Sequence, residues 1–116
     1  MHELVVVKQV MNTAVKYAQQ NNAAKIIGIY LQIGELRDCI DEWVQRYFDY
    51  ISKDTIAEGA KINIMHVSGV SLCDCGTFVQ VTHDNIFTLK CPRCGNEKLN
   101  IIRGQEFLIS GVEVVE

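Results

Sequence analysis

Four cysteines, arranged as two close pairs, are the residues of this chain best suited to chemistry. The pairs are Cys73-x-Cys75 and Cys91-x-x-Cys94, fifteen residues separate them, and a glycine follows each. Two such turns bring four thiolates to the corners of a tetrahedron, the geometry of structural zinc sites. The first pair is one residue shorter than the usual C-x-x-C, so its turn must wind differently. The sequence therefore predicts a structural Zn(II) site formed by Cys73, Cys75, Cys91 and Cys94.

Other interpretations of the cysteine pairs remain open at this point. Iron held by the same four thiolates would make a rubredoxin-like electron carrier. A zinc ribbon can also be a nucleic-acid-binding module, although a net charge of −3 argues against binding by phosphate neutralisation. Asp74 or His83 could take the place of one thiolate as a metal ligand. The simplest alternative to a metal site is four unrelated buried cysteines. Cys39 stands alone and is assigned no role.

The first three residues, Met1-His2-Glu3, form a second candidate metal site. The Met1 amine, the His2 imidazole and the amides of His2 and Glu3 can make a nearly square-planar nitrogen set. Ni²⁺ and Cu²⁺ favour that geometry, and Zn²⁺ does not. Taken alone, however, a histidine so near the end of a chain is usually just solvated. We expect His66 to be a partly buried structural residue and His83 to be exposed in a turn.

The apolar pattern predicts the elements that must position these residues. Three- and four-residue steps indicate helices, and strict alternation indicates half-buried strands. The predicted helices cover residues 4–18 and 40–51, the second with Asp38 as N-cap, and the predicted strands cover residues 27–33 and 62–67. Within the cysteine-rich segment from Ser71 to Arg103, short strands are predicted at residues 78–81, 86–89 and 99–102.

The C-terminal tail decides the domain organisation. Residues 107–115 alternate as a strand, with Gly111 at a bend that shifts the register. A small cysteine module needs no such strand, so we expect the tail to join the first sheet. The predicted fold is α+β: a small mixed sheet with two helices against one face, plus an inserted zinc ribbon. The predicted domains are residues 1–69 with 104–116, and a zinc ribbon at residues 70–103.

Composition narrows the class of protein. With 48% hydrophobic and 22% charged residues, the 116-residue chain has the balance of a soluble globular protein. It has no run of about 20 apolar residues and no basic secretory start, so we expect a cytoplasmic protein with no membrane partner. In that reducing compartment the cysteine pairs favour metal over disulfides. No Ser/His/Asp, Cys/His or phosphate-cradling pattern is present in the sequence, so we expect no enzyme.

Several segments together resemble the hydrogenase nickel-incorporation accessory proteins of the HypA type. They are Met1-His2-Glu3 with the helix that follows, Ile33-Gly34-Glu35-Leu36, the stretch from Thr55 to Ala60, and the four-cysteine module. The resemblance spans essentially the whole chain and departs from the family at Cys73-x-Cys75, where C-x-x-C is usual. It implies that Ni(II) is a transient cargo bound by His2, the Met1 amine and the Glu3 amide. It also implies a structural Zn(II) on the four cysteines.

The resemblance further implies partners. These are a nickel-insertion GTPase, the large subunit of a nickel–iron hydrogenase and, for some members, urease and its maturation proteins, with no nucleic acid. In such proteins a ribbon histidine, here His83, can approach the nickel in some states. A short tether around an inserted module permits domain swapping, so both a monomer and a swapped homodimer remain open.

Overall fold

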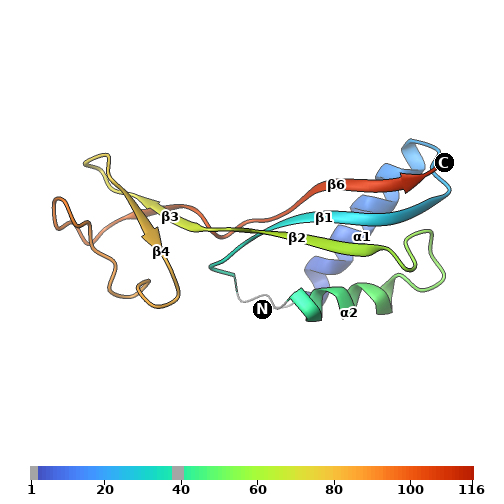
Figure 1. Cartoon of the computed structure of the whole chain (residues 1–116), viewed down its shortest axis with the longest axis horizontal. Coiled ribbons are helices and arrows are strands. Elements are labelled where there is room, and N and C mark those ends of the chain that lie inside the picture. The colour runs from blue at the N-terminus through green and yellow to red at the C-terminus, as the bar shows by residue number, and fades with distance from the viewer. Residues whose placement is uncertain (1–2, 38–40) are drawn as a thin grey trace. The chain divides into compact units, whose positions relative to one another are not determined.

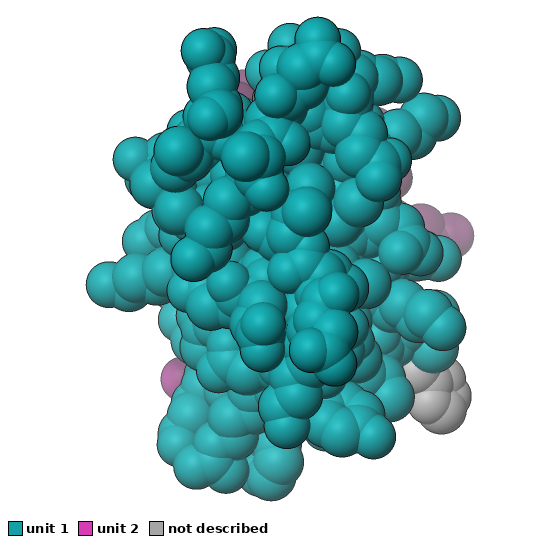
Figure 2. Space-filling model, turned by 90° about the vertical axis from the view of Figure 1, so that its right-hand side faces the viewer, with its two compact units in different colours: residues 1–31, 39–65, 108–116 teal, residues 32–38, 66–107 magenta. Residues whose placement is uncertain are grey.

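The computed structural model describes residues 3–37 and 41–116. Predictions for Met1, His2, Asp38, Cys39 and Ile40 lie outside the described residues. The chain divides into two compact units, coloured separately in Figure 2. The first comprises Met1–Leu31, Cys39–Met65 and Leu108–Glu116, and the second comprises Gln32–Asp38 and His66–Phe107.

Two helices and two small sheets make up the described chain. In order, the elements are α1 (Glu3–Gln20), β1 (Lys25–Gly34), α2 (Asp41–Ile51), β2 (Lys61–Val67), β3 (Gly69–Leu72), β4 (Phe78–Val81), β5 (Asn100–Arg103) and β6 (Phe107–Val115). One sheet has the strand order β2-β1-β6 and the other has the order β4-β3-β5 (Figure 1). The α+β fold class predicted from the sequence is confirmed.

The first sheet is mixed. β1 and β2 run in the same direction (Figure 1), and α2 lies in the connection between them, as parallel strands require a long crossover. β6 runs antiparallel to β1, because the Ala24 amide donates to the Val115 carbonyl at 2.7 Å and the Gly34 amide to the Glu106 carbonyl at 2.8 Å. The predicted return of the C-terminal tail to the first sheet is therefore confirmed.

The core of the first unit lies between its helices and its sheet. α1 and α2 contact each other, and α1 passes behind the strands in Figure 1. The helical spacing predicts the buried positions in part. Leu4 and Trp43, which lie on the predicted stripes, are 44% and 43% exposed. The stripe residues at 0–1% exposure are Val7, Ala14, Ala18, Val44 and Phe48. The predicted alternation in β1 holds at Ile29 and Leu31 and fails at Ile27, which is 40% exposed. Ile26 takes the buried position there, with its amide bonded to the Ile56 carbonyl.

The sheet of the second unit is antiparallel, with β3 between β4 and β5. β4 coincides with the predicted strand at residues 78–81, and β5 begins one residue later than predicted. The predicted strand at residues 86–89 is wrong, because that segment forms turns. The Asn85 side chain accepts a bond from the Thr82 amide at 2.8 Å, and the Ile86 amide donates to the Thr82 carbonyl at 3.0 Å. These local bonds replace the sheet pairing.

Three glycines allow the backbones of the second unit to cross at short range. A Cβ atom at Gly34 would lie 2.0 Å from the carbonyl carbon of Gly104, and one at Gly104 would lie 2.6 Å from the Gly69 Cα. Gly104 also has a φ of +110°, a conformation that other residues rarely adopt. The crossing therefore has no room for a side chain.

Gly34→Ala is expected to destabilise the protein because its Cβ meets backbone, which cannot rotate away as a flexible side chain can. The predicted loss is about 1–3 kcal/mol or more, the range for overpacked sites. Gly111→Ala is the matched control, since the nearest atom to its added Cβ is a Tyr30 carbon at an ordinary 3.8 Å. Urea unfolding followed by circular dichroism measures both. Equal midpoints for the two variants would show that the crossing is not tight.

Candidate metal centre

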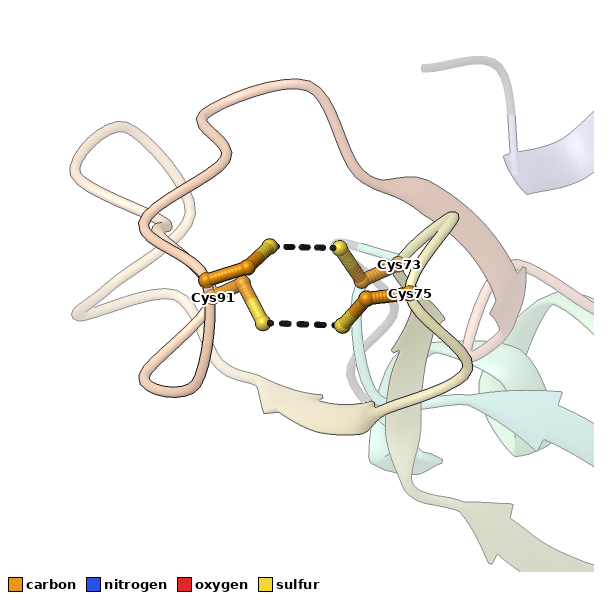
Figure 3. A group of neighbouring side chains, drawn as sticks. Cys73, Cys75 and Cys91 are labelled. Atoms are coloured by element: carbon orange, nitrogen blue, oxygen red, sulfur yellow. Dashed lines mark hydrogen bonds between the residues drawn. The ribbon is translucent and has the colours of Figure 1, made fainter.

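The structure brings the four predicted cysteines together. The Sγ atoms of Cys73 and Cys94 are 3.4 Å apart, and those of Cys75 and Cys91 are 3.7 Å apart. All four sulfurs lie within 4.8 Å of one another, and Figure 3 shows Cys73 and Cys75 pointing towards the pair that contains Cys91. Four sulfurs at about 2.3 Å from one zinc ion are about 3.8 Å apart at tetrahedral corners. The cluster therefore has the dimensions of a tetrathiolate site, while its separations exceed a disulfide bond.

Each pair sits on a tight turn closed by its glycine. The Gly76 amide donates to the Cys73 carbonyl at 2.8 Å, and the Gly95 amide donates to the Cys91 carbonyl at 2.9 Å. The hydrogen bond that closes the turn joins residues three positions apart in the shorter pair and four positions apart in the longer pair. Both glycines have positive φ values, +91° and +78°. The missing residue in the first pair is absorbed by a tighter turn, which leaves both cysteines able to face the centre.

A second relation is shared by the two turns. The first cysteine of each pair donates its amide to the residue two positions after the second cysteine: Cys73 to the Thr77 carbonyl and Cys91 to the Asn96 carbonyl, both at 2.9 Å. The side chains of these two acceptors also reach sulfur. Thr77 Oγ1 lies 3.1 Å from Cys75 Sγ, and Asn96 Nδ2 lies 3.9 Å from Cys73 Sγ. Sequence reasoning missed both residues, although their equal offset from the cysteine pairs was visible.

The cluster is buried on one side only. Cys73 and Cys91 are 2% and 1% exposed, while Cys75 and Cys94 are exposed. The first cysteine of each turn therefore anchors the site inside the unit. The second cysteine of each turn borders solvent, where water or a competing ligand approaches first.

The electrostatics of the cluster favour a cation. The backbone amide of Cys94 lowers the pKa of Cys91 to about 6, assisted by that of Arg93 and opposed by burial. The Thr77 hydroxyl, followed by the Thr77 amide, lowers the pKa of Cys75. For Cys94, the Asn96 amide favours the thiolate, but the neighbouring Cys73 thiol and burial oppose it, and the pKa rises to about 12. Adjacent thiolates repel one another, so a dication held by these sulfurs would displace protons from them as it binds.

The donor set suits a borderline or soft metal. Thiolates select Zn²⁺ or iron and are poor ligands for Mg²⁺ or Ca²⁺. Asp74 is exposed between the two cysteines of the first turn. The His83 ring nitrogen Nε2 lies 2.8 Å from the Glu35 carbonyl oxygen. Among the described residues, the group of ligand atoms close enough to share one ion consists of the four cysteines. The residues present therefore fit a structural zinc ion.

The other predicted site residues are placed as follows. Glu3 is the first residue of α1, and Met1 and His2 lie outside the described residues. His83 is exposed, as its position in a polar turn predicts. His66 is also exposed, so the prediction of a partly buried histidine is wrong. It follows Met65, itself 63% exposed, at the end of β2, where the alternating burial of that strand breaks down.

The fold and the site define a metal-binding α+β protein with a tetrathiolate centre, and comparison with known proteins identifies its family. Residues 1–114 match the family model for hydrogenase/urease nickel incorporation, metallochaperone, HypA. The hydrogenase maturation factors HypA of Dehalococcoides mccartyi and Caldanaerobacter subterraneus are each 35% identical over 98% of this chain, covering 94% and 99% of those proteins. The solution structure of the Ni metallochaperone HypA from Helicobacter pylori is similar in fold, with a TM-score of 0.70 and 20% identity over 99% of this chain and 98% of that one.

The chain belongs to the HypA family. The match extends through both units, whereas a rubredoxin-like carrier or a nucleic-acid-binding ribbon would account for the second unit alone. Neither helix of the described chain has the length and apolar character that crossing a membrane requires.

Proposed function

We propose that this protein is a nickel metallochaperone for nickel–iron hydrogenase maturation, which binds Ni(II) at its N-terminus and delivers it to the hydrogenase large subunit. The observation that carries the proposal is the family match from residue 1 to residue 114, which includes the N-terminal tripeptide. The role is binding and transfer, with no covalent bond made or broken by the protein.

The proposed nickel ligands are His2, the Met1 amine and the Glu3 amide. The start of α1 at Glu3 supports this set, because the first amides of a helix have no intrahelical acceptor. They are therefore not committed to the helix when a metal displaces their protons. The positive end of the helix dipole also favours a deprotonated, negatively charged amide at this position.

We propose that Cys73, Cys75, Cys91 and Cys94 hold Zn(II) in a structural role. The observed sulfur spacing supports the assignment. Among the described residues of the second unit, Ile33 and Val81 are the buried apolar side chains apart from the cysteines. A unit with so small a core needs a metal to fold. The proposed zinc ribbon is residues 70–103, inserted into a nickel-binding domain of residues 1–69 and 104–116.

The proposed partners follow from family membership. They are a nickel-insertion GTPase that works with the chaperone, the hydrogenase large subunit that receives nickel and, in organisms that use it, urease maturation. The proposed location is the cytoplasm. Both a monomer and a domain-swapped homodimer are compatible with an inserted ribbon.

Transfer of labelled nickel tests the proposal. The protein, loaded with radioactive Ni(II) and freed of excess metal, is mixed with the nickel-free large subunit and the GTPase. We expect the label to move to the large subunit, and to move much less when free chelator replaces the chaperone as the nickel source. Label that stays on this protein throughout, in the presence of both partners, would contradict a delivery role.

A further inference from the structure

The shortened cysteine turn has side-chain contacts to its sulfurs in addition to the backbone amide of Thr77. Thr77 Oγ1 lies 3.1 Å from Cys75 Sγ, and Asn96 Nδ2 lies 3.9 Å from Cys73 Sγ. Both sulfurs of the C-x-C turn thus have a side-chain donor beside them. In the longer turn, Cys91 is approached by the backbone amides of Arg93 and Cys94, and Cys94 by the backbone amide of Asn96.

The chemistry of the Thr77 contact is fixed once a metal is bound. A cysteine that ligates zinc is a thiolate and has no proton to give. The Thr77 hydroxyl must then donate and the Cys75 sulfur must accept. Hydrogen bonds from outer residues orient a ligand and tune its donor strength, and their loss typically weakens metal binding 10- to 100-fold.

The position of Cys75 makes this donor matter. Cys75 is exposed, whereas Cys73, its partner in the turn, is 2% exposed. Water, acid or a chelator therefore reaches the Cys75 sulfur early in metal loss. Thr77 is half-buried and its carbonyl is fixed by the Cys73 amide at 2.9 Å, so its hydroxyl is held in place beside the sulfur.

We propose that Thr77 is a positioning residue of the zinc site, whose hydroxyl holds the exposed Cys75 thiolate on the metal and so compensates for the residue missing from the first turn. Asn96 acts in the same way on Cys73, more weakly because of its longer contact. Its side-chain oxygen also accepts from the Lys98 amide at 3.0 Å, so substituting it would disturb the turn as well. Thr77 therefore gives the cleaner test.

The inference rests on the zinc assignment proposed above, and the test separates the two. Full-length zinc-loaded protein is mixed with a chromogenic chelator, and the rate of zinc release is compared for the wild type, Thr77→Val, Thr77→Ser and Thr88→Val. Thr77→Val keeps the shape and removes the donor, and Thr77→Ser keeps the donor. Thr88 lies in the same ribbon and its hydroxyl donates to the Asn85 carbonyl at 3.4 Å, an acceptor that is not a sulfur, which makes it the matched control.

We expect Thr77→Val to weaken zinc binding about 10-fold or more, with correspondingly faster release, while Thr77→Ser and Thr88→Val stay close to the wild type. Cobalt substitution gives a second readout that a merely structural role would not move. Loss of the hydrogen bond raises the energy of the sulfur electrons, so the thiolate-to-cobalt charge-transfer band of Thr77→Val should shift to longer wavelength.

The results distinguish a failure of the role assigned to Thr77 from a failure of the zinc assignment. If Thr77→Val releases zinc at the wild-type rate and leaves the cobalt band unmoved, the role of Thr77 is refuted while the zinc site stands. If the wild-type protein purified with its four cysteines reduced holds no zinc and takes up none, the zinc assignment and this inference fall together. Faster release from Thr77→Ser equal to that from Thr77→Val would also overturn the inference, since the serine retains the donor.

Discussion

Replacing Cys91 or Cys94 by alanine is expected to release the zinc and unfold the ribbon while the helices of the first unit stay folded. Each change leaves three thiolates, and Cys91 is also a 1% exposed anchor of its turn. Structural zinc contributes an apparent binding free energy of about 10–16 kcal/mol to small metal-dependent modules. The buried apolar side chains of the second unit cannot replace a contribution of that size.

The first unit has its own core, which makes the expected unfolding local. Phe48, Val44 and Ile29 are fully buried and belong to the first unit, whereas the four zinc-site cysteines belong to the second. Amide hydrogen exchange should therefore show loss of protection in β3, β4 and β5 and retained protection in α1 and α2. Cys39→Ala is the matched control, because that cysteine is assigned no metal and the zinc content should stay at one per chain. The assignment of the four ligands is wrong if Cys91→Ala and Cys94→Ala also keep one zinc each.

The elements with a strong apolar period were predictable from the sequence. α2 buries Val44 and Phe48, as its three- and four-residue spacing predicts. β6 pairs with β1, as its alternating apolar residues predict for a strand of the first sheet. β3 was missed for a physical reason. Its buried positions are Gly69 and Ser71, and the Ser71 hydroxyl donates to the Val79 carbonyl at 3.0 Å. A strand that buries small or polar residues gives no hydrophobic signal.

The four metal ligands of the candidate site were predictable from the sequence, and the side chain that contacts the Cys75 sulfur was not. The spacing of the cysteines predicts which sulfurs converge. Two close pairs, each on a tight turn, supply the four ligands of a tetrahedral site. The contact of Thr77 with Cys75 depends on how the shortened turn winds. The equal offset of Thr77 and Asn96 from the two pairs marks these positions but does not show that their side chains reach sulfur. The wrong prediction of a strand at residues 86–89 has a similar cause. The Asn85 side chain accepts from the Thr82 amide and the segment forms turns, an effect that apolar alternation does not register.

The second large effect is expected at the nickel site. His2→Ala removes the proposed side-chain ligand of the set, and we expect the loss of nickel affinity to exceed the roughly 10–100-fold caused by outer-shell changes. Because the amine, the imidazole and the amides must all lose protons to bind, affinity should rise steeply with pH. Titration with Ni(II) at several pH values, followed by the absorption of the square-planar complex, measures both effects. His66→Ala, at the exposed end of β2, is the matched histidine control and should bind nickel normally.

Nickel affinity in protein that carries one extra residue before Met1 tests the proposed N-terminal site most directly. The extension converts the Met1 amine into an ordinary amide and moves the free amine out of reach of His2, while every side chain stays in place. We expect nickel binding nearly as weak as that of His2→Ala, with the zinc content and the circular dichroism spectrum unchanged. A plain histidine site would be indifferent to the extension. Extended protein that binds nickel as tightly as protein with the authentic N-terminus would contradict the proposed site and direct the search to His66 or His83.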